Sequence, residues 1–393
     1  MLFSLALIFL CGLLLGSIAS KLNLPKLLGM LLTGILLGPY VLNLIDSSIL
    51  MISTDLRQIA LIIILLRAGL NLETAGLKKV GRPALLLCFI PASFELVGSI
   101  VLAPRLLGLS IAEAALLGTV IAAVSPAVIV PKMLKLMESN YGTNKNIPQM
   151  ILAGASVDDV FVIVLFTSCT GFVKEGTLSW MNLMKIPTSI VLGLLGGVFG
   201  GLLLTKLFKL FSIRDSVKVI LLLSSAFLYV TLEHSITANI GFSGLLATMG
   251  MGITLQQSRS VVAKRLSTKF SKLWVAAEIL LFVLVGATVD LNYALTCGVS
   301  AILLIFGVLV FRMVGVYCCL LGTNLTKKER IFCMIAYCPK ATVQAAIGSI
   351  PLTLGFDCGP TILTVAVLSI LITAPIGAFT IEHTYPKLLT KDS

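Results

Sequence analysis

Two adjacent acidic residues, Asp158 and Asp159, lie inside an apolar run that extends over roughly residues 148–173. Successive residues of a helix point about 100° apart, so one carboxylate can face a cavity while its neighbour meets a side partner or lines the same cavity obliquely. Ser156 lies three residues before Asp159, on the same face, and offers a neutral oxygen. Such hard oxygens suit a partly dehydrated alkali cation, and burial together with like-charge proximity favours the protonated carboxyl group. The pair is therefore a candidate site at which a monovalent cation such as Na⁺ competes with protons.

Three more ionisable residues fall within apolar runs: Glu95, Arg312 and Lys340. Charges at membrane depth cost about 2.5–3.5 kcal/mol each on insertion scales, so they should have partners. Arg312 stays protonated and cannot carry a proton, and it is predicted to form a permanent ion pair with Glu95. Lys340 either offsets the C-terminal ends of half-helices or pairs with an aspartate. In the structural alternative, Arg312 and Lys340 only neutralise the two aspartates.

Helix-breaking residues interrupt two of the apolar runs near their middles. Ser125-Pro126 interrupts 111–137, and Cys338-Pro339-Lys340 interrupts 329–353. Proline removes a backbone donor and clashes with the preceding turn, which frees carbonyl oxygens at membrane depth. Such breaks are tolerated where they line a cavity, although a single proline can equally produce a simple kink. Ser125 and the carbonyls beside it are therefore candidate cation ligands.

The composition places this chemistry in a lipid bilayer. The chain has 393 residues, of which 58% are hydrophobic and 12% are charged, and its mean hydropathy is +1.08. A water-soluble core cannot hide that much apolar surface. Divided by the length that a helix needs to cross a membrane, the apolar runs predict thirteen membrane spans. They extend over about residues 1–20, 27–44, 56–71, 83–104, 111–137, 148–173, 187–211, 217–233, 239–255, 273–289, 298–321, 329–353 and 359–381.

Most basic residues fall in loops on one side of the membrane if the N-terminus is outside. The positive-inside rule then predicts an external N-terminus and 174–186 loop, with a cytoplasmic 256–272 loop and C-terminus. The net charge of +12 reflects this bias rather than a nucleic-acid surface, because the basic residues are neither gathered on one domain nor interleaved with aromatic residues.

The first run lacks a basic n-region, which favours an uncleaved anchor. Glu278, near the expected inner face, is a candidate gate or pH sensor.

The two broken spans are the fifth and the twelfth, and because seven is an odd separation they run in opposite directions. Spans 1–6 and 8–13 then form two inverted six-helix repeats joined by span 7, in an all-α membrane fold with crossed broken helices. The buried charges all fall in spans 4–6 or 11–13, which separates a charged core from an apolar scaffold. We expect scaffold helices over 1–82 and 217–290, core helices over 83–174 and 298–381, and a linker helix over 187–211.

Enzymatic classes fit this sequence poorly. With two His residues and nine Cys residues without zinc-like spacing, a metalloenzyme is not expected, and no cofactor is expected either. The run over 241–244 reads as the GxSG of rhomboid proteases, but neither histidine lies mid-span to act as its base. An aspartyl protease needs carboxylates that face each other across a cleft, which adjacent residues on one helix cannot do. A channel is a further alternative, although it would not need titratable ligands at the crossing.

The motifs around these residues resemble the monovalent cation/proton antiporter superfamily. The matching runs are 125–131, 155–159 and 339–346, and the likeness covers essentially the whole chain. Within the superfamily the chain is most similar to the sodium/proton antiporters of the NHA branch, as a bacterial member in the inner (cell) membrane. The resemblance implies a homodimer built on the scaffold helices, and an elevator-like cycle that exchanges Na⁺ or Li⁺ for protons.

The same resemblance maps the family's cation-binding aspartates onto Asp158 and Asp159, with Asp159 as the direct ligand. Electrogenic relatives carry a lysine in the eleventh span that pairs with the first aspartate, whereas this chain has Arg312 there. Glu95 stands where the NHA branch places a partnering acid. The exchange stoichiometry of those relatives therefore does not apply to this chain. A K⁺/proton antiporter or a cation-coupled organic-solute symporter of the same fold stays open as an alternative.

Overall fold

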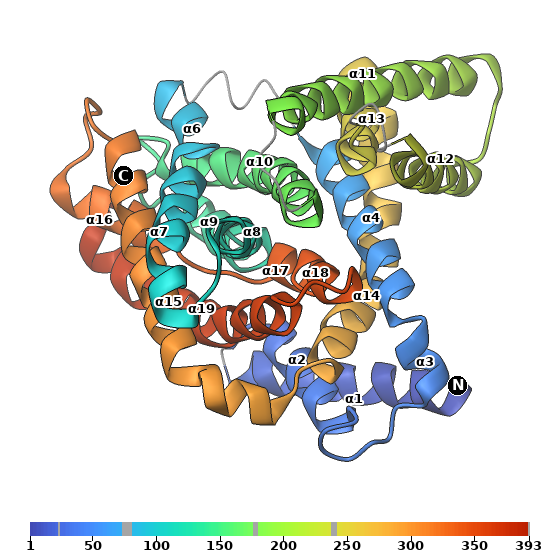
Figure 1. Ribbon diagram of the computed structural model, residues 1–393. Coiled ribbons are helices and arrows are strands. Elements are labelled where there is room, and N and C mark those ends of the chain that lie inside the picture. The colour runs from blue at the N-terminus through green and yellow to red at the C-terminus, as the bar shows by residue number, and fades with distance from the viewer. Residues whose placement is uncertain (23, 73–80, 176–179, 237–241, 392–393) are drawn as a thin grey trace. The chain divides into compact units, whose positions relative to one another are not determined.

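The computed structural model describes residues 1–22, 24–72, 81–175, 180–236 and 242–391. Within these ranges, the side chains of residues 156, 160, 174–175, 180–187, 234–236 and 291–297 lie outside the description. The described part is helical, and its β-structure amounts to one isolated antiparallel bridge between Tyr141 and Lys391. Figure 1 shows the arrangement of the helices. They are α1 (Leu2–Lys21), α2 (Lys26–Leu37), α3 (Ser47–Met51), α4 (Ser53–Asn71), α6 (Arg82–Leu87), α7 (Ile90–Leu107), α8 (Ile111–Ile121), α9 (Pro126–Glu138), α10 (Ile147–Glu175), α11 (Trp180–Leu210), α12 (Asp215–Ile236), α13 (Gly244–Ser258), α14 (Ser260–Ala287), α15 (Leu291–Cys319), α16 (Lys327–Ala336), α17 (Thr342–Ile347), α18 (Ile350–Thr353) and α19 (Gly359–Leu388).

Nine helical stretches in the described ranges are long and apolar enough to cross a membrane. Many large apolar side chains on these helices are exposed, as expected for surfaces that face lipid rather than water. The protein is therefore an all-α protein that spans the membrane several times. The count of thirteen spans and the inverted repeats stay predictions.

The helices form two units, each packed internally. One comprises residues 1–54, 75–162 and 279–393, and the other comprises 55–74 and 163–278. The first unit holds every ionisable residue proposed for the buried cluster, whereas Glu278 belongs to the second. Since α10 and α14 contribute residues to both units, these boundaries do not follow the predicted scaffold, core and linker segments, and that division stays a prediction.

Two interrupted helices lie at the centre of the first unit. The first break, at residues 122–125, separates α8 from α9, and the second, at residues 337–341, separates α16 from α17. The last helix, α19, contacts α8, α9, α16 and α17, while α7 packs along α15 and against α8 (Figure 1). Both breaks occur where the proline motifs predict them.

Local sequence explains where the half-helices begin. Pro126 is the first residue of α9, where its missing N–H costs no hydrogen bond and its restricted φ suits a helix. Ser110 and Glu113 form a capping box at the start of α8, and Thr326 and Glu329 form another at the start of α16. The half-helices are therefore specified locally, and the extended residues between them must find hydrogen-bond partners elsewhere.

In the second unit, α11 and α12 pack against α13 (Figure 1). Gly197 of α11 permits a close approach, since an added Cβ would lie 2.6 Å from the carbonyl oxygen of Ala247 in α13. Such small-residue contacts are typical of helix pairs in membranes, where backbone proximity replaces hydrophobic exclusion of water as the source of packing energy.

Several helices do not begin and end with the predicted membrane spans. The 256–272 segment is helical apart from Arg259, with α13 ending at Ser258 and α14 beginning at Ser260. Most of 174–186 also belongs to α10 and α11, while 176–179 lie outside the described residues. The predicted fourth span divides into α6 and α7 at Cys88 and Phe89, just ahead of Pro91, because proline disfavours helical geometry in the residues before it.

Candidate functional site

The two breaks cross in direct contact. The backbone N–H of Ser125 donates to the carbonyl oxygen of Pro339 over 2.8 Å. Helix α19 makes room for the crossing at Gly377, where an added Cβ would collide with the Pro339 ring. The predicted crossing of the two broken helices is therefore present, and an extended stretch from each one lies at its centre.

Helix α10 brings the first aspartate to this crossing. Gly154 lets α10 pack closely against Tyr337, because an added Cβ there would collide with the hydroxyl of Tyr337. One turn later, the side chain of Asp158 is fully buried. Its Oδ2 accepts hydrogen bonds from the backbone N–H of Val124 at 2.8 Å and from Arg312 Nη2 at 2.9 Å. Asp158 is thus anchored both to the first break and to α15.

The buried guanidinium of Arg312 joins four groups around the crossing. Nη1 lies 2.9 Å from Glu95 Oε2 in α7, and Nη2 lies 2.9 Å from Asp158 Oδ2. Nε donates to the carbonyl oxygen of Tyr337 at 2.6 Å, and Nη1 also donates to the carbonyl oxygen of Ala122. The predicted Glu95–Arg312 ion pair is confirmed. Because a guanidinium presents five donors in a planar fork, the same arginine also holds the first aspartate.

Lys340 binds Glu95 rather than an aspartate. Its Nζ lies 2.5 Å from Glu95 Oε2, and both side chains are buried. The backbone N–H of Lys340 donates to Thr373 Oγ1 at 2.9 Å, which holds the chain just after Pro339. Pairing of Lys340 with an aspartate is therefore wrong. Lys340 and Arg312 share Oε2 of Glu95, and Arg312 also holds Asp158.

The charges of this cluster balance except at Asp159. Glu95 and Asp158 offset Arg312 and Lys340, and each of these four side chains takes part in an ion pair. None of the ion pairs found in the described ranges includes Asp159, and its Oδ1 is buried without a hydrogen-bond partner there. A carboxyl group in such surroundings is stable either when it is protonated or when a bound cation balances its charge.

Four further side-chain oxygens of the cluster and the crossing are buried and make no hydrogen bond within the described part of the chain. They are Asp158 Oδ1, Glu95 Oε1, Ser125 Oγ and Thr342 Oγ1. Ser125 is the last residue of the first break and directly precedes α9, and Thr342 is the first residue of α17, so each hydroxyl lies at the start of the half-helix that follows a break. Thr342 was not predicted from the sequence, although a hydroxyl residue two positions after Lys340, beside the second break, could have indicated it.

Two sequence candidates are not placed at the crossing. The backbone of Ser156 belongs to α10, but its side chain lies outside the described residues. Glu278 is a half-buried residue of α14 and belongs to the second unit, whereas the charged cluster belongs to the first. The roles expected for these two residues stay predictions.

Side chains engage the carbonyl oxygens that the first break releases. Gln344 Nε2 donates to the carbonyl oxygens of Ala123 at 2.8 Å and Ile121 at 3.3 Å. Arg312 donates to the carbonyl oxygen between them, that of Ala122. Each of these three carbonyls therefore has a side-chain donor from α15 or α17. The role of the carbonyls beside Ser125 as cation ligands stays a prediction.

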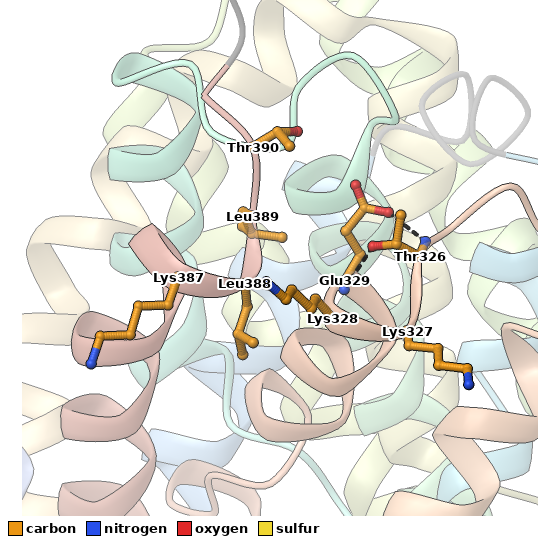
Figure 2. Close-up of a pocket in the computed structure, with 8 residues that line it drawn as sticks. All are labelled: Thr326, Lys327, Lys328, Glu329, Lys387, Leu388, Leu389 and Thr390. Atoms are coloured by element: carbon orange, nitrogen blue, oxygen red, sulfur yellow. Dashed lines mark hydrogen bonds between the residues drawn. The ribbon is translucent and has the colours of Figure 1, made fainter.

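A separate cavity of about 410 Å³ lies between the start of α16 and the end of α19 (Figure 2). Figure 2 shows Lys327 and Lys387 at its two sides, pointing away from each other. Glu329 is already committed, since it caps the backbone N–H of Thr326 at 2.6 Å and pairs with Lys145 Nζ at 2.8 Å. None of the buried acids of the crossing lines this cavity, so the candidate site lies elsewhere, at the crossed breaks.

Comparison with known proteins agrees with this geometry. The family described as "Sodium/hydrogen exchanger, transmembrane" matches residues 5–385. The chain is 34% identical over 424 residues to human sodium/hydrogen exchanger 9B2, covering 99% of this chain and 75% of that protein. It is 33% identical over 388 residues to human sodium/hydrogen exchanger 9B1, covering 94% of this chain and 73% of that protein.

A solved structure shows the same fold. The sodium proton antiporter MjNhaP1 from Methanocaldococcus jannaschii superimposes with a TM-score of 0.85, covering 98% of this chain and 97% of that one at 23% identity. Crossed broken helices with buried charges at their centre are typical of secondary transporters in membranes. The chain belongs to the sodium/hydrogen exchanger family of monovalent cation/proton antiporters.

Proposed function

We propose that this protein exchanges Na⁺ or Li⁺ for protons at Asp158 and Asp159. The observation that carries the proposal is the uneven charge balance of the buried cluster. Arg312 and Lys340 pair with Glu95 and Asp158, which leaves Asp159 as the acid of this cluster for which no cationic partner is found among the described residues. A proton or a small cation can supply the missing charge. Because both use the same carboxylate, binding of one displaces the other.

Oxygen donors suited to such a cation are present at the crossing. The unpaired oxygens of Asp159, Asp158, Ser125 and Thr342 are hard donors of the kind that alkali cations accept. We assign Asp159 as the direct ligand, because Oδ2 of Asp158 is already engaged by two donors. Ser156 is a further neutral ligand in this proposal. The ions are the transported substrate, and the exchange needs no cofactor.

We propose an elevator-like cycle in which the core segments 83–174 and 298–381 carry the site across the membrane. The ion pairs that join α7, α10, α15 and the second break support this, since all of them connect residues of the core segments. A core that moves as one piece keeps these pairs intact, so no buried charge is stranded during the cycle. The scaffold segments 1–82 and 217–290 then form the contact of a homodimer, with 187–211 as the linker.

The proposed location is the inner (cell) membrane, with the N-terminus outside and the C-terminus in the cytoplasm. The bias of basic residues toward one set of loops supports this orientation. Lys327, Lys328 and Lys387, which surround the cavity at the ends of α16 and α19, would then lie on the cytoplasmic side. Glu278 is proposed as a gate or pH sensor near the same side.

A vesicle assay tests the proposed exchange. The purified protein is placed in vesicles with an acidic interior, and a fluorescent probe reports the internal pH. Addition of NaCl or LiCl should dissipate the gradient, choline chloride should not, and Asp159→Asn should remove the response. Dissipation that does not depend on the added cation would instead indicate a channel, and a response to KCl alone would indicate a K⁺/proton antiporter.

A further inference from the structure

Gln344 is a buried side chain that ties the start of α17 to the first break. Its Oε1 accepts from the backbone N–H of Ala341 at 2.9 Å, and its Nε2 donates to the carbonyl oxygens of Ala123 and Ile121 at 2.8 and 3.3 Å. A backbone N–H can only donate and a carbonyl can only accept, so these contacts fix which end of the side-chain amide is oxygen. Glutamine satisfies both kinds of partner at once.

The carbonyl that Gln344 holds belongs to the same peptide group as the N–H that binds Asp158. Ala123 C=O and Val124 N–H are the two ends of one trans peptide, which is planar and turns as a unit. Val124 N–H donates to Asp158 Oδ2 at 2.8 Å. The two hydrogen bonds therefore share one rigid plane and polarise each other, so a change at Gln344 reaches Asp158.

This arrangement determines which oxygen of Asp158 is left open. Oδ2 accepts from Val124 and Arg312, whereas Oδ1 is buried without a hydrogen-bond partner in the described part of the chain. We propose that Gln344 is a positioning residue for cation/proton exchange, which holds the Ala123–Val124 peptide so that Asp158 keeps Oδ2 engaged and presents Oδ1 to the cation. Gln344 itself does not touch the ion.

The inference rests on the proposed exchange at Asp158 and Asp159, and it specifies which property of transport changes. Without the hydrogen bond to Ala123, the peptide can turn and Asp158 loses a donor that stabilises its ionised form. Protons then compete better with the cation at a given pH. The apparent KM for Na⁺ should rise about tenfold, which corresponds to about 1.4 kcal/mol, and the activity profile should move to more alkaline pH. The maximal rate should change little.

Two variants separate this role from simple capping of α17. Gln344→Glu keeps an oxygen for the N–H of Ala341 but, when ionised, has no donor for the carbonyl of Ala123. Gln344→Met keeps the side-chain length and removes all three hydrogen bonds without adding charge, so agreement between the two variants excludes a purely electrostatic cause. Gln149→Met is the matched control, because the buried Oε1 of Gln149 in α10 makes no hydrogen bond within the described residues.

The vesicle assay, run as a NaCl titration at several pH values, gives KM, maximal rate and pH profile for each variant. Thermal melting with and without NaCl measures folding and cation binding independently of transport. We expect both Gln344 variants to show a raised KM and a smaller Na⁺-dependent rise in Tm, with the control unchanged. A wild-type KM and pH profile in either folded variant would overturn the inference. Failure of both variants to fold would also overturn it, because Gln344 would then be purely structural. Absence of exchange in the unmodified protein would instead refute the proposed function.

Discussion

Asp158 Oδ2 and Arg312 Nη2 lie 2.9 Å apart, and both side chains are fully buried. Arg312 stays protonated at any physiological pH, so Asp158 keeps a permanent counter-charge for as long as this contact lasts. Asp159, the next residue along α10, has no ion-pair partner among the described residues. The two neighbouring aspartates therefore differ in their surroundings, since Asp158 is paired with a cationic side chain and no such pair is found for Asp159 among the described residues.

Asp159→Asn should abolish exchange, because it removes both the charge and the titrating group. Asp158→Asn should impair exchange severely and should also lower thermal stability more than Asp159→Asn, since it removes one counter-charge of the buried Arg312. Initial rates in vesicles and melting temperatures in detergent measure the two effects. Normal transport by Asp159→Asn would refute the assignment of the site.

Protons and the cation should compete for the same carboxylates. Lowering the pH should raise the apparent KM for Na⁺ or Li⁺ with little change in maximal rate, because a saturating cation displaces the protons. Cation titrations of the vesicle assay at several pH values provide the measurement. If pH changed only the maximal rate, a separate regulatory group such as Glu278 would account for the effect.

Glu95 accepts from both Arg312 and Lys340, so its loss strands positive charge. Glu95→Gln alone should lower stability by about 3–5 kcal/mol, as expected when one partner of a buried pair is removed. Combining it with Lys340→Gln should recover part of that loss, because one charge of each sign is removed and Arg312 keeps Asp158. Thermal denaturation provides the measurement.

A second double variant, Glu95→Gln with Arg312→Gln, serves as the comparison for the Glu95–Lys340 variant. It leaves Lys340 and Asp158 without the partners that they have in the structure, so it should recover less stability than the Glu95–Lys340 combination. Equal or greater recovery would contradict the pairing seen in the cluster.

Ser125→Ala should weaken cation binding without destabilising the fold. Ser125 Oγ is buried and makes no hydrogen bond in the described part of the chain, so its removal leaves no partner unsatisfied. The apparent KM for Na⁺ should rise about fivefold, which corresponds to about 1 kcal/mol, at an unchanged melting temperature. Thr342→Val removes the buried hydroxyl at the start of α17. A wild-type KM in both variants would exclude the two hydroxyls as ligands.

The orientation in the membrane can be tested at two exposed positions, Lys264 in α14 and Ser47 in α3. In a background without the nine native cysteines, a membrane-impermeant thiol reagent should label Lys264→Cys only from the cytoplasmic side. Ser47→Cys should react only from outside, because the positive-inside rule places it on the opposite face. Labelling of Lys264→Cys from outside would overturn the proposed orientation.

The sequence alone determined the class of the protein and most of the members of its buried cluster. A bilayer penalises every unpaired charge and every unsatisfied backbone group, so acids, bases and prolines inside apolar runs stand out and must have partners. On that basis Asp158 and Asp159 were identified as candidates, Glu95 was paired with Arg312, and both breaks were located. The helix ends were less predictable, because amphipathic basic segments such as 256–272 continue a helix beyond its apolar part.

Only the tertiary structure decided the pairings beyond that of Glu95 with Arg312. Arg312 reaches Asp158 as well as Glu95, Lys340 shares Glu95, and Gln344 takes up the carbonyls of the first break. The choice of partner depends on the rotation and depth of each helix, and one residue of error turns a side chain by about 100°. Long flexible side chains add several ångströms of reach, so many pairings satisfy the same sequence until the helices are packed.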